Sequence, residues 1–338
     1  MIRYTVTPED ATNQAVTFES SNPSVAQVDN QGKVTAIAVG SAKVTVTTVD
    51  GGFTAGCTVT VKEAPSSIMV DGVYYRVSGT SLAVIPPPDE VKYSGHITVP
   101  GTIVYEDIEY NVTALDSRAF RDSPDLLSVT LEEGIQRIDS WAFYRCVNLE
   151  AISIPSTVNY INKDNPVFTL CPKLEISVNQ TGDEVNFFVQ DHALYQPYQN
   201  EIILRWVPEK LTGTFRVLDG TTSIYEFAIA HTSFDKIVIP RSVNYIEPQF
   251  FYGTYDDGEW FCKTPLEIAL NWVTAEEVNA ITTHESDPSF FYFRFMDRSQ
   301  ITVTVPNGTK ALYESHWLWS ACGAIVEREE ESPVKASF

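Results

Sequence analysis

Hydrophobic side chains recur at a fixed spacing in the middle of the chain. Three similar units start at Leu115, Ile138 and Ile161, so successive starts are 23 residues apart. Near the end of each unit apolar and polar residues are interleaved, as in the run L-L-S-V-T-L at 126–131. A unit of this length cannot bury its apolar side by itself, so copies must stack on one another. The spacing therefore predicts a solenoid.

Each unit contains two kinds of apolar position. The runs at 126–131 and 149–154 predict parallel strands whose apolar side chains point inward. The alanine–phenylalanine pairs at 119–120 and 142–143 predict a small residue and a ring that fill the opposite side of the layer. We therefore expect repeats over 115–178.

The period lapses at 179–210, where two strand-like runs around a polar loop predict a β-hairpin insertion. It resumes over 211–253. The segment I-P-R-S-V-N-Y-I at 239–246 nearly duplicates I-P-S-T-V-N-Y-I at 154–161, which indicates a common repeat.

Segments without the period flank the repeats. Alternating residues over 68–114 predict an N-terminal β cap, which a stack needs to cover its first open edge. Strands and short helices over 260–327 predict a C-terminal cap, and 328–338 reads as a tail.

The first 63 residues predict a separate all-β domain. Short strands flank the turns Asp29–Gly32 and Asp50–Gly52, as in two hairpins. The small residues and proline of 64–67 then predict a linker. In the last strand, 53–61, alternation places Phe53 and Cys57 on one apolar face, so we expect Cys57 in the core.

Cys146 and Cys171 occupy one equivalent position in successive units. A disulfide or half of a metal site is one interpretation. No His or further Cys accompanies them, which favours two small buried residues in neighbouring layers.

The N-terminal residues V-T-P-E-D-A-T-N, S-S-N-P-S-V-A-Q-V-D, G-K-V-T-A-I-A-V-G-S-A and C-T-V-T-V resemble the bacterial immunoglobulin-like domain of group 2. The resemblance covers about residues 1–62. The family normally has one or two further strands before Tyr4, so the resemblance implies an incomplete sandwich with an unpaired sheet edge.

The segment 68–327 resembles the BspA-like leucine-rich-repeat family of bacterial surface proteins. The pattern I-x-x-x-A-F-x-x-C-x-x-L-x-x-I-x-I-P at 138–155 carries the resemblance, with A-L-Y…I-L-R-W-V-P at 193–208 and V-P-N-G-T…Y at 305–313. It implies a right-handed solenoid on an extracellular, secreted or lipid-anchored protein. The fold class expected is mainly β, an incomplete immunoglobulin-like sandwich followed by a leucine-rich-repeat solenoid with β-rich caps.

The net charge of the chain limits the classes of partner that it can bind. The chain has 23 Lys and Arg against 44 Asp and Glu, a net charge of −21. Such a field repels nucleic acid and anionic lipid. No apolar run approaches the roughly 18 residues of a membrane span. We expect no nucleic acid partner and no membrane span, and the sequence does not decide the oligomeric state.

No familiar catalytic motif is present: GxSxG, HExxH, the P-loop and GxGxxG are all absent. The five histidines are scattered without metal-ligand spacing. We expect no enzyme, cofactor or metal. A hydrolase would need two carboxylates that face each other across a cleft about 5–10 Å wide.

The candidate binding surface follows from solenoid geometry, because the concave sheets of repeat proteins are broad binding faces. Between the inward apolar positions the strands carry mostly Ser, Thr and Ala. Arg216 and Lys236 are basic exceptions in an acidic chain. A second candidate patch consists of the aromatic residues Tyr252, Tyr255, Trp260 and Phe261, of the kind that stacks on sugars or peptides.

The favoured hypothesis is therefore a non-enzymatic extracellular adhesion protein whose solenoid binds a protein ligand such as a host or matrix protein. The alternative is a cell-surface accessory protein that binds a glycan through the aromatic patch.

Overall fold

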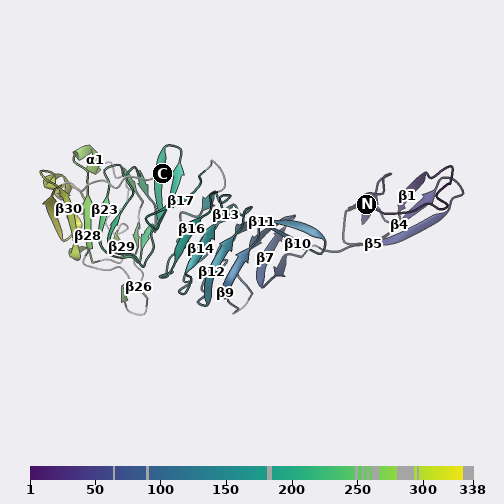
Figure 1. Cartoon of the computed structure of the whole chain (residues 1–338), viewed down its shortest axis with the longest axis horizontal. Helices are drawn as coiled ribbons and strands as arrows, with labels where there is room; N and C mark the ends of the chain where they lie inside the picture. Colours follow the sequence, from purple (N-terminus) through teal and green to yellow (C-terminus); the bar gives the residue numbers. More distant parts are fainter. Residues whose placement is uncertain are drawn as a thin grey trace. The chain divides into compact units, whose positions relative to one another are not determined.

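The structure is a computed structural model of the whole chain (Figure 1). It describes residues 1–63, 65–88, 91–180, 185–247, 250–252, 255–256, 259–260, 266–279, 293–294 and 297–329. The chain divides into two compact units, Met1–Ser66 and Ser67–Phe338. We call them the N-terminal unit and the repeat unit, and we describe each by itself.

The N-terminal unit consists of two small antiparallel sheets. Its main sheet has the order β1-β4-β5, and a hairpin joins β2 to β3. The bounds are β1 (Val16–Ser20), β2 (Ala26–Val28), β3 (Val34–Ala36), β4 (Gly40–Thr48) and β5 (Thr54–Val61). Val25, Ala26 and Ala42 form its small core. Both predicted hairpins are confirmed, and turn glycines with positive φ close them.

The expectation that Cys57 lies in the core is wrong. Cys57 is exposed, and Phe53 on the same face is 75% exposed. The Phe53–Cys57 part of this face lines an open groove of about 500 Å³, whereas Val59 and Val61 further along β5 pack against the small core. Alternation shows which side chains share a face of a strand, but it does not show whether anything covers that face.

The repeat unit begins with a stack of two sheets that lie on opposite sides of one core. The longer strands form the sheet β16-β14-β12-β9, and the shorter ones extend the sheet β15-β13-β11-β8-β7-β6, with β10 paired to β11. We call these the long-strand sheet and the short-strand sheet of the first stack. Their bounds are β6 (Ser67–Val70), β7 (Val73–Ser78), β8 (Ser81–Val84), β9 (Gly95–Val99), β10 (Thr102–Tyr105), β11 (Ile108–Leu115), β12 (Leu126–Leu131), β13 (Arg137–Ile138), β14 (Ala151–Ile154), β15 (Tyr160–Ile161) and β16 (Glu175–Val178).

Parallel pairing at the repeat period builds this stack. Leu115 pairs with Ile138, and Ile138 with Ile161. On the other sheet Val129 pairs with Ile152. All of these side chains are at most 5% exposed. The 23-residue spacing thus returns each apolar residue to the same place one layer further along, as predicted.

Aromatic rings and cysteines form two further ladders through the first stack. Phe143 lies between Phe120 and Phe168, with ring centroids 5.2 and 5.8 Å away. Cys146 donates from Sγ to the carbonyl of Phe120, and Cys171 donates to that of Phe143, at 3.1 and 3.0 Å. Both thiols are buried and free, which confirms the prediction of small buried residues.

The hairpin of β18 and β19 opens a second stack and does not merely interrupt the first. The two strands pair antiparallel, and β19 then pairs parallel with β21. One side of the hairpin, with Leu194 and Trp206, belongs to the first core, while Tyr195 and Leu204 belong to the second. The hairpin is therefore a layer shared by both stacks.

The second stack repeats the plan of the first. The sheet β20-β23-β28-β30-β31 continues the series of long strands, and β17-β18-β19-β21-β24 that of short strands, with β22-β25-β29 and β26-β27 beside them. The bounds are β17 (Phe188–Gln190), β18 (Ala193–Tyr198), β19 (Glu201–Trp206), β20 (Thr212–Arg216), β21 (Ser223–Ile224), β22 (Ile229–Ala230), β23 (Ser233–Ile239), β24 (Tyr245–Ile246), β25 (Phe251–Tyr252), β26 (Tyr255–Asp256), β27 (Glu259–Trp260), β28 (Leu266–Leu270), β29 (Phe293–Arg294), β30 (Ile301–Pro306) and β31 (Ala324–Arg328). The first long strands of the two stacks, β9 and β20, each carry a glycine of positive φ next to a register shift, Gly95 and Gly213.

Aromatic side chains close the far end of the second core. Trp272 and Trp319 are fully buried, and Tyr313 donates from its hydroxyl to the carbonyl of Trp272 at 2.7 Å. The helices here are short: α1 (Ala275–Asn279), α3 (Lys310–Glu314) and two 3₁₀ turns, Arg298–Gln300 and Trp319–Ala321. Their apolar residues pack on the last strands, as a terminal cap requires.

Candidate functional site

A groove lies where the series of long strands passes from the first stack to the second. Its volume is about 380 Å³, which falls within the range of ligand sites. We call it the junction groove. Its lining residues come from the turn between β17 and β18, from β20 and from the start of β23: Asp191, His192, Leu211, Thr212, Thr214, Phe215, Arg216 and Phe234.

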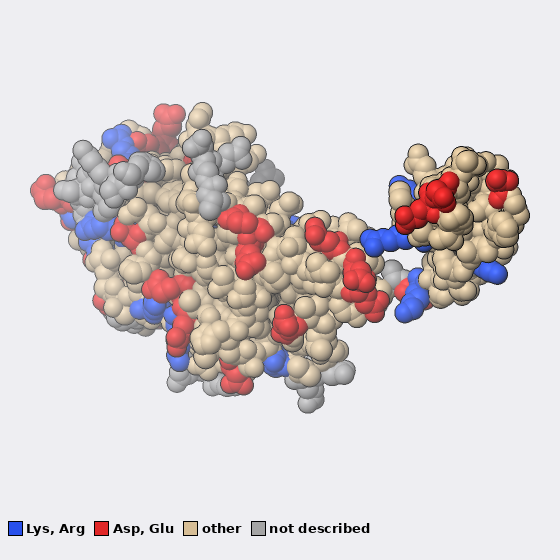
Figure 2. Space-filling view, turned by 45° about the vertical axis from the view of Figure 1, so that its right-hand side comes forward, with Lys and Arg blue, Asp and Glu red and all other residues tan. Residues whose placement is uncertain are grey.

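The first stack contributes a carboxylate beside this groove. Glu175 at the start of β16 accepts from Lys210 Nζ at 2.7 Å and contacts His192 Nδ1 at 3.3 Å. Partial burial raises the pKa of Glu175, but the bonds with Lys210 and His192 outweigh it and leave the pKa below its usual value. A carboxylate, an ammonium and an imidazole therefore lie together beside the groove. Figure 2 shows acidic side chains scattered over the visible face of the repeat unit.

Arg216 and Lys236 lie on one face of adjacent strands. Thr214 pairs with Lys236 and Arg216 with Val238, so the two basic residues are diagonal neighbours. Lys236 forms an ion pair with Glu267 of β28 at 2.9 Å, and only 21% of its side chain is exposed. The two are therefore not an isolated basic pair, because Lys236 has a carboxylate partner. Arg216 lines the junction groove, and a binding role for either residue stays a prediction.

The predicted aromatic patch is described only in its backbone. Tyr252 lies in β25, and Tyr255 pairs with Trp260 across β26 and β27. The side chains of these three residues, and Phe261 entirely, lie outside the described residues. The patch stays a prediction.

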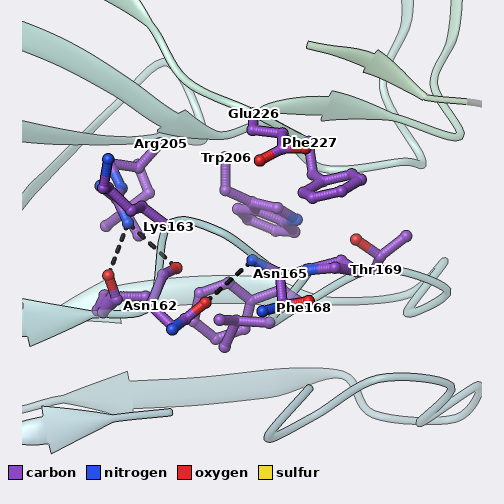
Figure 3. A pocket seen from close by; sticks show the side chains of 13 residues that line it. Asn162, Lys163, Asn165, Phe168, Thr169, Arg205, Trp206, Glu226 and Phe227 are labelled. Carbon is purple, nitrogen blue, oxygen red and sulfur yellow. Dashed lines mark hydrogen bonds between the residues drawn. The ribbon is translucent and has the colours of Figure 1, made fainter. Parts of the chain in front are cut away.

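On the short-strand side of the same junction, the side chains of Arg205 and Glu209 bond to backbone groups of the last repeat of the first stack. Arg205 of β19 donates to the carbonyls of Ile161 and Asn162 at 2.7 and 3.2 Å, which are the groups that end β15 (Figure 3). Its guanidinium also lies over the ring of Tyr225, 4.8 Å from the centroid. Burial lowers the pKa of Arg205 to about 10, and it still remains a cation at neutral pH.

The carboxyl group of Glu209 accepts hydrogen bonds from two backbone amides nearby. Within the first stack, amides such as that of Phe143 donate to a carbonyl of the next repeat. In the last repeat the amides of Leu170 and Cys171 donate instead to Glu209 Oε1, at 2.6 and 3.3 Å. Arg205 and Glu209, four residues apart, thus satisfy the donors and acceptors left open where the first stack ends.

The pocket beside Arg205 is too small for an organic ligand. Its interior holds about 20 Å³, room for about one water molecule. Glu226 lines it, and burial, together with the nearby carboxylates of Glu247 and Asp164, raises the pKa of Glu226 to about 7. The amide of Glu226 donates to Glu247. Glu226 and Glu247 therefore lie beside the contact between the two stacks, where the interior has no room for a substrate. We interpret this pocket as structural.

Sequence reasoning missed Arg205 and Glu209. The available signal was a cation inside the apolar strand I-I-L-R-W-V and a carboxylate directly after its proline. Within the described ranges, no cluster of three or more His, Cys, Asp or Glu could hold a metal ion. None of the helices in that part of the chain has the length and apolar composition that crossing a bilayer requires.

Two family models match the chain. The bacterial Ig-like domain of group 2 matches residues 2–59, and the BspA type leucine rich repeat region matches 102–187 and 211–259 in six copies. Among curated proteins, an uncharacterized protein of Clostridium acetobutylicum is 35% identical over 116 residues, which are 32% of this chain and 12% of that protein. Lacto-N-biosidase of Bifidobacterium bifidum is 57% identical over 58 residues, 17% of this chain and 5% of that protein. The chain thus spans only a small part of these relatives.

Solved structures show weaker overall likeness. A leucine rich cell surface protein of Faecalibacterium prausnitzii has a TM-score of 0.31 at 13% identity, covering 79% of this chain and 96% of that one. A leucine-rich repeat protein of Bacteroides ovatus has a TM-score of 0.38 at 13% identity, covering 77% and 76%. The two family matches and the stacked parallel strands agree with each other. The chain consists of a group 2 bacterial Ig-like domain followed by a BspA-type leucine-rich repeat region.

Proposed function

We propose that this chain is a non-enzymatic binding protein of the bacterial cell surface and that it holds a protein ligand, such as a host matrix protein, at the junction groove. Its repeat region belongs to a family of cell-surface proteins that generally bind or adhere and are typically not catalysts. The observation that carries the proposal is the groove of about 380 Å³ beside Arg216, set in an extended strand face.

The chemistry of the groove favours a protein ligand. Buried Phe215 and Phe234 form an apolar wall, Asp191 and Arg216 supply charges of both signs, and His192 adds an imidazole. A protein surface offers an anchoring side chain together with charged neighbours, and such central anchors carry most of the binding energy at interfaces. The strands on either side would supply the remaining flat contact area.

The test is binding of the full chain to a panel of purified matrix proteins by surface plasmon resonance. Arg216→Ala should weaken binding about tenfold, because it removes one charged anchor at the groove. Lys62→Ala is the matched control, since it removes the same charge from an exposed position in the N-terminal unit. Equal binding by Arg216→Ala and wild type would contradict the assignment of the groove. Absence of binding to every matrix protein would contradict the proposed ligand class.

A further inference from the structure

A second groove lies on the outer face of the short-strand sheet of the first stack. Its volume is about 360 Å³. One row of paired residues crosses it: Arg76 pairs with Ala83, Ala83 with Ala114, Ala114 with Arg137, and Arg137 with Tyr160. The two alanines form a low floor between taller side chains. We call this groove the alanine trough.

Ion pairs form the two walls of the trough. Arg76 forms a bidentate ion pair with Asp116. Its Nε donates to Oδ2 at 2.8 Å, and its Nη2 donates to Oδ1 at 3.1 Å. Arg137 Nη2 lies 3.0 Å from Asp139 Oδ2. Both arginines remain half exposed, at 51% and 50% of their side chains. The walls are therefore rich in hydrogen-bonding groups, yet each cation is balanced by an anion.

Apart from the buried Leu82, the rest of the lining is polar and uncharged. Ser78, Ser81, Gln136 and Asn159 line the trough, and within the described part of the chain their side chains bond to no other residue. Tyr160 closes one end with a ring that is 38% exposed. Hydroxyls, amides and one accessible ring are thus gathered around a floor of two methyl groups.

The backbone under the trough offers nothing to a peptide strand. The interior strands β8, β11 and β13 are each paired on both sides. An extended peptide binds a sheet by adding to an open edge, and no edge is available at this floor. A ligand must therefore bond to side chains.

We propose that the alanine trough binds a neutral oligosaccharide. Sugar hydroxyls both donate and accept, which matches arginine–carboxylate pairs, amides and hydroxyls, and the apolar face of a sugar ring packs on an aromatic ring such as Tyr160. The balanced walls do not attract an anion, and the net charge of −21 disfavours acidic glycans. This site is separate from the junction groove.

The test is a glycan array and titration calorimetry with the full chain, using neutral oligosaccharides and, as a comparison, uronic acid and sulfated ones. Two variants probe the trough: Ala114→Leu fills its floor, and Tyr160→Ala removes its end wall. Each has a matched control, Ala151→Leu on the long-strand sheet and Tyr198→Ala at an exposed tyrosine of β18. Thermal unfolding of all four variants shows that the fold is kept.

Both trough variants should raise the Kd for a neutral oligosaccharide about tenfold or more, and both controls should leave it unchanged. Three results would overturn the proposal: no neutral oligosaccharide binds, only acidic glycans bind, or binding survives both trough variants. In the last case, loss of binding in Trp260→Ala would assign glycan recognition to the predicted aromatic patch. None of these outcomes bears on matrix protein binding at the junction groove.

Discussion

Glu209 provides a sharp test of how the two stacks are joined. Burial raises the pKa of its carboxyl to about 8 from the usual 4.5, although the amides of Leu170 and Cys171 act in the opposite direction. The folded-state pKa lies above the unfolded-state value. The stabilising contribution is therefore complete below about pH 4.5 and is lost as the pH rises through 8. Glu209→Gln removes this titration and keeps an oxygen that can accept both amide bonds.

The size of the effect follows from the two pKa values. Between them the folded chain holds a proton that the unfolded chain has released, so the free energy of unfolding falls by about 1.4 kcal/mol per pH unit. From pH 6 to pH 8 the wild type should lose about 2 kcal/mol relative to Glu209→Gln. Other groups titrate equally in both proteins, so the difference between the two isolates Glu209.

Urea unfolding followed by tryptophan fluorescence measures this difference, because Trp206 packs at the junction. The difference in free energy of unfolding between the two proteins should widen by about 2 kcal/mol from pH 6 to pH 8, in favour of the variant. A gap that stays constant from pH 6 to pH 8 would refute the reasoning, since it would mean that the carboxyl is already ionised and held by its two amides.

Two further predictions concern the cores. Phe143→Ala should lower the free energy of unfolding by about 3–5 kcal/mol, because removal of a fully buried ring between two others leaves a cavity. Urea unfolding at pH 7 measures this loss. A loss below about 1 kcal/mol would contradict the packing of Phe143 between the two rings. Burial lowers the pKa of His231 and of His316 to about 4 from the usual 6.5. As the pH falls, these histidines are therefore protonated in the unfolded chain before they are protonated in the folded chain. Stability should therefore fall between pH 7 and pH 5 by about 2 kcal/mol per histidine, and His316→Gln should remove about half of that fall.

The sequence predicted the first stack well because its physics is local and periodic. The 23-residue spacing fixes which residues share a layer, so the register of Leu115, Ile138 and Ile161 and the burial of Cys146 and Cys171 followed from counting. These positions depend on neighbours one repeat away, which lie in the sequence at a known distance.

The failures involve partners that no period locates. Cys57 shares a strand face with Val59 and Val61 as predicted, but the valine end of that face packs against the small core while Cys57 is exposed. Glu267, which forms an ion pair with Lys236, follows a segment without the repeat pattern. The repeat spacing therefore could not predict which residue of β28 lies beside Lys236. Arg205 and Glu209 make sense only once the hairpin is known to join two stacks.

The candidate site was predictable only in part. Arg216 stood out as a cation in an acidic chain, and it does line a groove. The groove itself arises from the turn after β17 and from Lys210 reaching Glu175, which are contacts between the two stacks. The alanine trough was not predicted, because it depends on five strands that align Arg76, Ala83, Ala114, Arg137 and Tyr160 in one row.

Hydrogen–deuterium exchange of the full chain with and without a bound matrix protein tests directly whether the junction groove holds the ligand. We expect slower exchange at the turn after β17 and along β20, where Asp191, His192 and Arg216 line the junction groove. Slower exchange confined to the N-terminal unit, with β17 to β20 unchanged, would contradict it.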